Sequence, residues 1–306
     1  MIAAPKIRAG AAAGSLSARL RAGLLGLAAL AALACPAAAA EAQRIVSIGG
    51  GTTEILYRLG VQDRVVAVDT TSLYPPEATQ KPNVGYIRAL SAEGVLALSP
   101  DLILMEEGGG PPEVVALLDR AGVRVVHLPG GHSAQALPEK IRAIADAVGE
   151  KTEGTRLAGD VAADLERLRR DLATVKRRKR VLFVLSLVDG RPMAAGSDTA
   201  ADAMIRLAGG ENVFGEVHGY KTISPEAAAA LQPDVVLMVS RGGGLDPKAG
   251  ALKLPAFAET PAGKTGALVR MDALYLLGFG PRTAQAARDL AEKLYPEQAA
   301  AWKAQQ

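Results

Sequence analysis

Cysteine is nearly absent from this chain of 306 residues, and the single copy, Cys35, lies in an apolar N-terminal segment. If that segment is removed, no thiol remains, which excludes disulfide bonds, a cysteine nucleophile and thiolate metal ligands. Histidine is also scarce. The three copies, His127, His132 and His218, are spread over both halves of the chain instead of lying at the spacing of a metal site. A zinc site would therefore have to assemble from distant segments.

The motifs of common enzyme classes are missing as well. The chain contains no GxSxG nucleophile elbow and no HExxH zinc motif. Its glycine-rich turn, Gly49–Thr53, has neither the spacing of a dinucleotide fingerprint nor the lysine of a phosphate loop, so it indicates a tight strand-to-helix turn. The adjacent carboxylates Glu106 and Glu107 would point to opposite sides at the end of a strand. We therefore expect a protein that is not an enzyme.

The N-terminal residues are typical of a secretory signal peptide. Four basic residues precede or flank the short apolar run Gly23–Ala34, and the small residues Ala37–Ala40 follow it. The run falls short of the about 20 apolar residues that a membrane span needs, so a retained anchor is the less favoured alternative. We predict a signal peptide over residues 1–40, with cleavage after Ala40 or Ala42. Lipid attachment at Cys35 is disfavoured because the leucine expected three residues earlier is one position late.

Most of the chain's basicity belongs to that segment. Its removal takes away four basic residues and no acidic ones, and the formal net charge changes from +3 to −1. A nucleic-acid partner thereby loses its compositional support. The basic run Lys176–Arg180 follows a predicted helix, and we interpret it as a solvated helix C-terminus, where cations suit the helix dipole.

An internal repeat predicts two related lobes. Leu90–Met105 (LSAEGVLALSPDLILM) and Ile223–Met238 (ISPEAAAALQPDVVLM) are identical at eight of sixteen positions, and each follows a Gly-Tyr pair. Each copy fits a serine-capped short helix, a Pro-Asp turn and a buried strand.

Strand-like and helix-like segments alternate within each half. Apolar strands interleaved with helices indicate α/β lobes with parallel sheets covered on both faces. The predicted strands are Arg44–Ile48, Val65–Val68, Leu102–Met105, Val123–His127, Val181–Leu187, Val235–Val239 and Ala267–Met271. The predicted helices are Thr53–Leu59, Glu93–Leu98, Pro112–Ala121, Ala200–Leu207, Pro225–Leu231 and Arg282–Leu294.

A long helical segment separates the two halves. Its second part, from Leu157 to Val175, carries an apolar stripe at steps of three and four residues, and Gly149 marks a possible break. We predict a signal peptide over 1–40, an N-terminal lobe over 41–133, an interlobe helix over 134–176 and a C-terminal lobe over 177–306. A stiff connection of this kind permits only limited hinge motion.

Tyr74 stands out in the stretch DTTSLYPP that follows the strand Val65–Val68. The two prolines stiffen the loop and hold Tyr74 toward an extended conformation. Ligand loops gather at the carboxyl ends of strands in α/β lobes, and a phenolate is a hard ligand that suits ferric iron, in haem among other forms. A bound metal ion favours the deprotonated phenol. From composition alone, a solvated loop tyrosine is the alternative.

At these residues the sequence resembles the periplasmic haem-binding proteins of bacterial haem ABC importers. The resemblance runs through almost the whole chain after the signal peptide, and its sharpest parts are DTTSLYP (Asp69–Pro75), VGYIRALSAEGVLALSPDLIL (Val84–Leu104), GYKTISPEA (Gly219–Ala227) and LLGFGPR (Leu276–Arg282). The family's axial iron ligand is the tyrosine of the SLYP segment, which implies that Tyr74 binds the iron of haem in a cleft between the two lobes.

The resemblance also implies roles for residues around that cleft. The haem propionates require arginines, for which Arg88 and Arg241 are the candidates. His218 is a candidate for a second axial ligand or for a second stacked haem, with a solvent-facing loop histidine as the alternative. Tyr86 and Tyr220 pack either on the porphyrin or in the core.

Glu93 and Glu226 occupy equivalent positions of the repeat, at the starts of corresponding helices. By resemblance to the cobalamin-binding proteins of the same superfamily, they are the pair that docks onto permease arginines. Complementing a helix N-terminus is their alternative role.

These inferences imply a monomeric periplasmic protein that captures haem b (hemin) and delivers it to an inner-membrane haem ABC permease with its ATPase. A ferric siderophore or cobalamin is the alternative ligand within the same superfamily. A secreted haem-handling enzyme, such as an oxygenase, is the alternative from another class.

Overall fold

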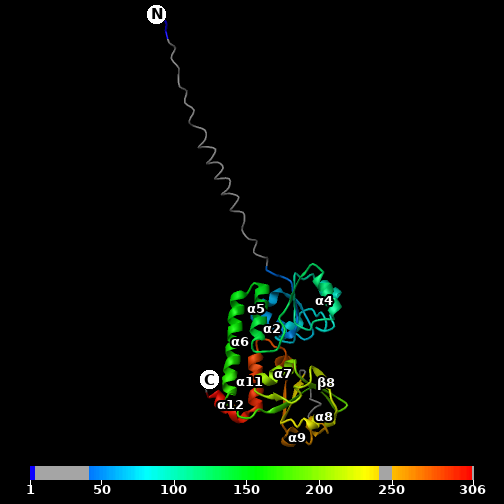
Figure 1. Cartoon of the computed structure of the whole chain (residues 1–306). Coiled ribbons are helices and arrows are strands. Elements are labelled where there is room, and N and C mark those ends of the chain that lie inside the picture. Colours follow the sequence, from blue (N-terminus) through cyan, green and yellow to red (C-terminus); the bar gives the residue numbers. More distant parts are fainter. Residues whose placement is uncertain (4–40, 241–249, 305–306) are drawn as a thin grey trace. The chain divides into compact units, whose positions relative to one another are not determined.

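The computed structural model describes residues 1–3, 41–240 and 250–304 (Figure 1). The chain divides into two compact units, Met1–Glu41 and Ala42–Gln306. Both sheets belong to the second unit. Arg241, predicted to lie near the cleft, falls outside the described residues.

The strands form two separate sheets, as the two predicted lobes require. Sheet A has the order β2-β1-β3-β4, and all its pairings are parallel. Sheet B has the order β10-β9-β5-β6-β8, with the short β7 paired to β5. The strands are β1 (Ile45–Ile48), β2 (Val65–Val68), β3 (Leu102–Met105), β4 (Arg124–His127), β5 (Arg180–Val188), β6 (Arg191–Ala195), β7 (Glu211–Asn212), β8 (Tyr220–Thr222), β9 (Val235–Ser240) and β10 (Leu268–Asp272).

The expectation of two parallel sheets is correct for sheet A and wrong for sheet B. Strand β5 turns back through Asp189 and Gly190 into β6, and β6 then pairs antiparallel with β8. Both backbone positions have positive φ, as the reversal of a tight hairpin requires. The sequence does not predict strands β6, β7 and β8 because their residues lack an apolar run. The fold class, α/β with two sheet-based lobes, is confirmed.

Helices cover both faces of each sheet (Figure 1). In the first lobe, α2 and α5 pack on the face of β1 that bears Ile45, whereas α3 and α4 pack on the opposite face with Val46. The helices are α2 (Gly50–Arg58), α3 (Ala92–Leu96), α4 (Pro112–Asp119), α5 (Ala136–Val148), α6 (Lys151–Leu172), α7 (Ala200–Leu207), α8 (Pro225–Ala230), α9 (Pro261–Thr265), α10 (Ala273–Leu277), α11 (Thr283–Leu294) and α12 (Pro296–Lys303).

The second lobe has the same layering. Helices α6, α7 and α11 share a core with Phe183 of β5, and α8 and α9 share a separate core with Leu182 on the other face of the strand. Alternate residues of one strand thus serve two cores, which is why its sequence is continuously apolar.

The predicted interlobe helix over 134–176 is two helices in the structure. Helix α5 ends at Val148, and the next residue, Gly149, takes the left-handed conformation (φ 86°) that favours glycine at a helix C-terminus. Helix α6 then packs back against α5, and Gly154 leaves no room for a side chain beside Ala145. Helix α6 contributes to both cores, with Leu157 in the first and Leu168 in the second, and α11 does so too, with Ala284 in the first and Leu290 in the second. The predicted lobe boundaries stay a prediction.

The helix caps expected from the repeat are present in both copies. Ser91 accepts a hydrogen bond from the backbone of Gly94 at 3.2 Å, and Ser224 accepts one from Ala227 at 3.1 Å. Each serine satisfies an N–H group that has no partner within its own short helix.

The aspartates of the two Pro-Asp turns also form equivalent hydrogen bonds. Asp101 accepts a hydrogen bond from the backbone N–H of Arg44 at 2.9 Å, and Asp234 accepts one from that of Arg180 at 3.0 Å. Each bond ties the start of a central strand to the turn before its parallel neighbour. The internal repeat is therefore a structural repeat of the α3–β3 and α8–β9 units.

Among the described residues, no helix combines the length and the apolar character needed to cross a membrane.

Candidate functional site

The loop that carries Tyr74 is held in place by one buried carboxylate. Asp69, directly after β2, accepts hydrogen bonds from the backbone of Gly49 and of Thr71, each at 3.0 Å. It also accepts bonds from the hydroxyls of Thr71 at 2.7 Å and of Ser72 at 2.9 Å. Four donors satisfy both oxygens of this buried side chain, so the loop has little freedom before it reaches Tyr74.

A chain of buried hydroxyl groups ties the same loop to the first strand and helix. The Ser72 hydroxyl lies 2.7 Å from that of Thr53 on α2, which in turn lies 2.8 Å from that of Ser47 on β1. The DTTS residues that precede Tyr74 are thus a structural anchor. They position a tyrosine that is itself 39% exposed.

Arg282 lies against the ring of Tyr74. Its guanidinium carbon is 3.4 Å from the ring centroid, well within the range of a cation–π contact. Both side-chain bonds to Glu54, from Nε and from one terminal nitrogen, are 2.9 Å long, and the backbone N–H of Arg282 donates to the same carboxylate at 3.2 Å. Glu54 comes from α2, and Arg282 immediately precedes α11. The pair therefore joins the two halves of the chain beside Tyr74.

The electrostatics of this pair favour its charged form. Burial by itself would lower the pKa of Arg282, but the hydrogen bonds and negative charge of Glu54 outweigh it and raise the pKa above its ordinary value. Glu54 is only 4% exposed. A buried carboxylate of this kind depends on its bidentate partner.

A second tyrosine completes the surroundings of Arg282. The Tyr275 ring centroid is 5.1 Å from the guanidinium, and its hydroxyl donates to Asp289 at 2.9 Å. Burial and this hydrogen bond raise the pKa of the Tyr275 phenol, so it stays a neutral donor. A cavity of about 390 Å³ lies here, lined by Leu73, Tyr74, Asp272, Leu274, Tyr275, Arg282 and Asp289. Its walls come from both lobes.

The glycine-rich turn at Gly49–Gly51 brings the two lobes together. A side-chain carbon on Gly51 would overlap the carbonyl oxygen of Gly278, and one on Gly50 would overlap Leu274. The turn does begin a helix, as the sequence predicts. The structure also explains the successive glycines, because the segment before Arg282 approaches the backbone of this turn too closely for side chains to fit.

Two predicted cleft residues of the first lobe, Arg88 and Tyr86, affect the phenol of a third, Tyr220. Burial raises the pKa of the Tyr220 phenol, the charge of Arg88 lowers it and Tyr86 raises it. Arg88 and Tyr86 belong to the first lobe and Tyr220 to the start of β8, so residues from both halves come within electrostatic range. Tyr86 is 48% exposed and Arg88 is exposed too, which leaves both available to a ligand.

His218 is well exposed, and its Nδ1 lies 2.8 Å from a carboxylate oxygen of Asp198. Among the described residues, no hydrogen bond or ring contact joins it to Tyr74. The other two histidines lie in different surroundings. His127 lies 2.9 Å from Asp119, and the His132 ring makes a T-shaped contact with Phe279, with centroids 4.7 Å apart. Within the described part of the chain, no cluster of histidine, cysteine and carboxylate side chains could hold a metal ion.

Glu93 and Glu226 are exposed in the first turns of α3 and α8, next to the capping serines. Hydrogen bonds from Ser224 and from the backbone lower the pKa of Glu226, so it carries its charge over the neutral range. Both positions are free of ion pairs with the described residues and are open to a partner.

Sequence reasoning missed Glu54, Arg282 and Tyr275. The segment LLGFGPR carries part of the resemblance, yet the sequence alone assigns no role to its arginine. The sequence pattern around Arg282 is a weak indication of function, because an arginine after Gly-Pro is common and the pattern does not show that Glu54 is its partner. Glu54 lies 228 residues away from Arg282 in the chain.

A model of the periplasmic binding protein family matches residues 45–275. Among solved structures, the periplasmic heme-binding protein BhuT in complex with two hemes is similar, with a TM-score of 0.77 and 39% identity over 84% of this chain and 99% of that one. Identity at this level over nearly the whole of a solved chain indicates a common fold and family.

Two curated proteins are also similar. An uncharacterised ABC transporter substrate-binding lipoprotein, YvrC of Bacillus subtilis, is 27% identical over 84% of this chain and 81% of its own length. A vitamin B12-binding protein of Vibrio campbellii is 26% identical over 64% of this chain and 70% of its own length. All of these are binding proteins.

Proposed function

Because the chain belongs to the periplasmic binding protein family, we propose that it is the substrate-binding protein of a haem importer and that Tyr74 binds the haem iron. The observation that carries this proposal is the placement of Tyr74. A fully hydrogen-bonded carboxylate, Asp69, anchors its loop, and its exposed ring faces a cavity lined by both lobes. The similarity to heme-binding BhuT supports haem as the ligand.

The chemistry of the site suits this cargo. A phenolate oxygen is a hard ligand that prefers ferric over ferrous iron. The exposed Tyr86 offers aromatic surface for the macrocycle, and the exposed Arg88 offers its guanidinium to a propionate, whereas Tyr220 packs against the core with its ring centroid 6.5 Å from that of Phe183. Arg241 retains its proposed propionate role from the resemblance alone. None of these groups forms an arrangement of nucleophile and base, which fits capture without chemical change.

Titration of the processed protein with haemin, followed by visible absorption, tests this function. We expect saturation with a phenolate-to-iron charge-transfer band and unchanged haem after prolonged incubation with a reductant. Saturation at two equivalents would support a second haem bound through His218. No spectral change would contradict the proposal, and steady conversion of haem to an open-chain product would point to an enzyme instead.

A corrinoid is the second candidate ligand, since a similar protein is a vitamin B12-binding protein. Cobalamin or a ferric siderophore would not require the phenol of Tyr74. Cyanocobalamin binding measured by calorimetry separates the two ligands, because a haem-binding site is expected to show no heat with it. Saturable cyanocobalamin binding without haemin binding would assign the corrinoid.

We also propose that the protein delivers its cargo to an inner-membrane ABC permease through Glu93 and Glu226. Both glutamates are exposed at the starts of α3 and α8, the two helices that correspond in the structural repeat. One anion on each lobe provides two matched contacts to a permease of two-fold symmetry. Since such a permease lies in the inner membrane, the predicted signal peptide and a periplasmic location fit this role.

Charge reversal at the two positions tests the docking proposal. Glu93→Lys together with Glu226→Lys is expected to abolish haem-dependent growth of cells that rely on this importer, while haemin binding by the purified variant stays unchanged. Glu113→Lys and Glu297→Lys make a matched control, since both residues occupy the first turns of other helices. Undiminished growth of the Glu93/Glu226 variant would contradict the proposal.

A further inference from the structure

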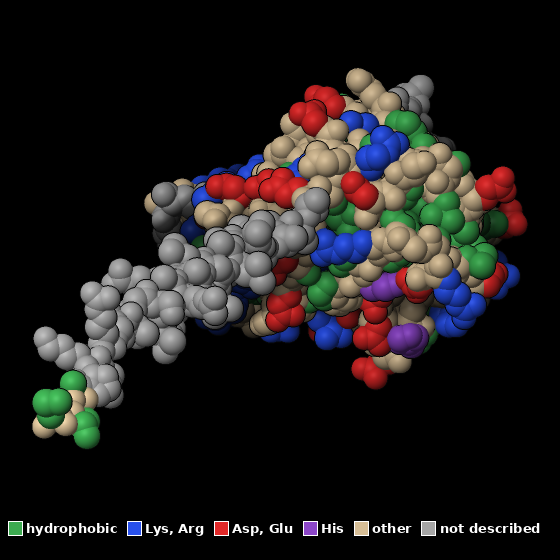
Figure 2. All heavy atoms as spheres, turned by 90° about the horizontal axis from the view of Figure 1, so that it is seen from above, with side chains coloured by type: hydrophobic (Ala, Val, Ile, Leu, Met, Phe, Trp, Pro, Cys, Tyr) green, Lys and Arg blue, Asp and Glu red, His purple; other side chains and the backbone are tan. Residues whose placement is uncertain are grey.

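The positive charge of the chain after the signal segment is concentrated in one short stretch. Residues 167–180 contain eight basic residues and one acidic residue, a net charge of +7, although residues 41–306 together carry −1. We call this stretch the basic segment. The remaining residues of that part of the chain therefore carry about −8 in sum. By contrast, acidic and basic side chains are interspersed over the face drawn in Figure 2.

The helix dipole accounts for only part of this charge. Helix α6 ends at Leu172, so Arg169 and Arg170 lie in its last turn, where cations are stabilised. The run Lys176–Lys179 lies beyond the helix, and the dipole effect falls off within one turn. All four residues of this run are exposed. The helix dipole therefore does not account for this run, in which Arg177 lies 3.4 Å from Asp234.

Intramolecular ion pairs neutralise the basic segment incompletely. Arg169 binds Glu166 through two bonds, and Arg180 lies 3.1 Å from Glu211. No ion pair joins Lys176, Arg178 or Lys179 to any residue in the described ranges. These three cations are exposed and form no ion pair with the described residues, so their charge is available to an external anion.

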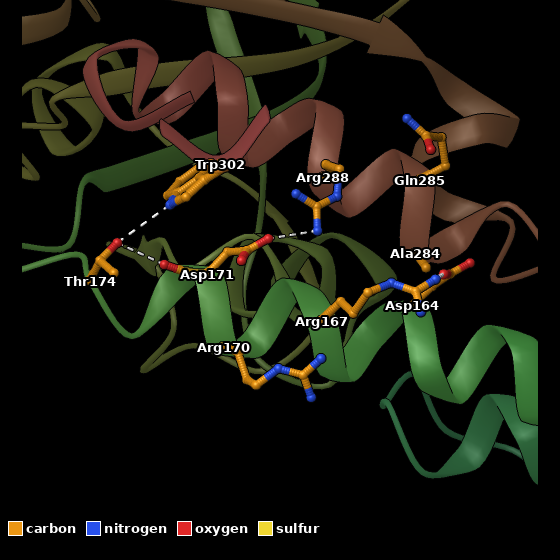
Figure 3. Close-up of a pocket in the computed structure, with 9 residues that line it drawn as sticks. All are labelled: Asp164, Arg167, Arg170, Asp171, Thr174, Ala284, Gln285, Arg288 and Trp302. Atoms are coloured by element: carbon orange, nitrogen blue, oxygen red, sulfur yellow. Dashed lines mark hydrogen bonds and ion pairs between the residues drawn. The ribbon is translucent and has the colours of Figure 1, made fainter. Parts of the chain in front are cut away.

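Cavities lie on both sides of α6 near the basic segment. One of about 750 Å³ is lined by residues of α6, α11 and α12, among them Arg167 and Arg170 on α6 and Arg288 on α11, which is paired to Asp171 (Figure 3). Another of about 610 Å³ lies toward α7 and is bordered by Arg169, Arg178 and Arg206. Most of these arginines are paired, Arg167 with Asp164 and Arg206 with Asp202, so the cations of this region without an ion pair to the described residues are those beyond the helix end.

The basic segment belongs to a different layer from the proposed docking helices. Helix α6 packs in the core shared with α7 and α11, and α8, which carries Glu226, packs in the core on the other face of sheet B. In the first lobe, α3, which carries Glu93, likewise packs on the face of sheet A opposite to that of α6. A permease held by the two glutamates would leave the basic segment uncovered.

We propose that the basic segment binds the surface of an anionic phospholipid bilayer. Each Lys or Arg near such a surface contributes about 1 kcal/mol, and arginine forks pair well with phosphate oxygens. A flat array of phosphates does not require cations held in a fixed pattern, whereas recognition of one acidic protein does. The side chains of Lys176, Arg178 and Lys179, which no ion pair with the described residues holds in place, therefore fit a bilayer better than an acidic protein. The half-buried Leu172 and Val175 lie beside them.

Sedimentation with lipid vesicles tests this proposal on the unit from Ala42 onward, which has its own cores. We expect binding to vesicles of phosphatidylglycerol mixed with phosphatidylcholine, and none to phosphatidylcholine alone. Lys176→Glu, Arg178→Glu and Lys179→Glu together are expected to lower the partition coefficient at least about 100-fold. Raising the salt from about 0.1 M to about 1 M shortens the Debye length roughly threefold and is expected to release the protein.

The matched control reverses three exposed cations elsewhere, Arg58, Arg120 and Lys253, with the same change in net charge. This variant is expected to retain most of its binding to the anionic vesicles. Equal losses in both variants, or no binding of the unaltered unit, would overturn the proposal. Retention on immobilised polyglutamate without binding to vesicles would also overturn it and would assign the surface to an acidic protein. Haemin binding is not needed for any of these results, so the proposal stands or falls separately from the proposed role in haem import.

Discussion

Tyr74→Phe is expected to abolish the phenolate-to-iron charge-transfer band and to weaken haemin binding by more than about 100-fold. Removal of a residue that only supports a metal ligand typically costs 10–100-fold, and loss of the ligand itself costs more. Phenylalanine keeps the ring that Arg282 contacts at 3.4 Å, so the change isolates the hydroxyl. Visible absorption during a haemin titration measures both effects.

Two further variants sharpen that result. Tyr275→Phe also removes one phenol beside Arg282, but it is expected to leave the charge-transfer band in place, because the Tyr275 hydroxyl already donates to Asp289. Tyr74→His offers iron a nitrogen ligand, and we expect binding to be partly restored with a changed spectrum. If Tyr74→Phe binds haemin with the band intact, another residue is the ligand and the proposed site is wrong.

Arg282→Ala is expected to destabilise the protein by about 3–5 kcal/mol, because it leaves the carboxylate of Glu54 buried without its partner. Glu54 is 4% exposed, and Arg282 donates three hydrogen bonds to it. The substitution removes the two from the side chain and leaves only the one from the backbone N–H. Loss of the guanidinium also removes the contact with Tyr74. Urea unfolding monitored by circular dichroism measures the change in the free energy of unfolding.

An exposed ion pair provides the comparison for Arg282. Arg156 binds Glu153 and Asp160 on the surface of α6, and Arg156→Ala is expected to leave the free energy of unfolding almost unchanged, because water screens exposed ion pairs. Pairing Arg282→Met with Glu54→Leu tests the mechanism, since removal of both charges is expected to recover much of the loss. An effect of Arg282→Ala as small as that of Arg156→Ala would show that the pair contributes little to stability.

The two variants separate ligand binding from stability within one site. Tyr74 is exposed and makes few structural contacts through its hydroxyl, so its substitution is expected to leave unfolding nearly unchanged. Arg282 joins α2 to the segment before α11, and its substitution affects both the fold and the orientation of Tyr74. Arg282→Lys retains the positive charge but lacks the planar guanidinium that binds both oxygens of Glu54. A loss of haemin affinity in this variant would indicate that haem binding depends on the orientation of the Tyr74 ring.

Local patterns in the sequence determined much of the fold. Continuous apolar runs marked the central strands because each of them is buried on both faces, and serine caps marked α3 and α8 because their hydrogen bonds are made within a few residues. The repeat identified two lobes. Tyr74 could be singled out because prolines act locally and because the surrounding motif resembles a known family.

Only the tertiary structure decided the features that depend on residues distant in the chain. The antiparallel edge of sheet B arises from the hairpin at Asp189 and Gly190, and the packing of α6 back on α5 arises from the close contact of Gly154 with Ala145. The partnership of Glu54 with Arg282 spans 228 positions. Burial and ion pairing are properties of the folded chain, and a sequence pattern of short range cannot encode which distant side chain will neutralise a buried charge.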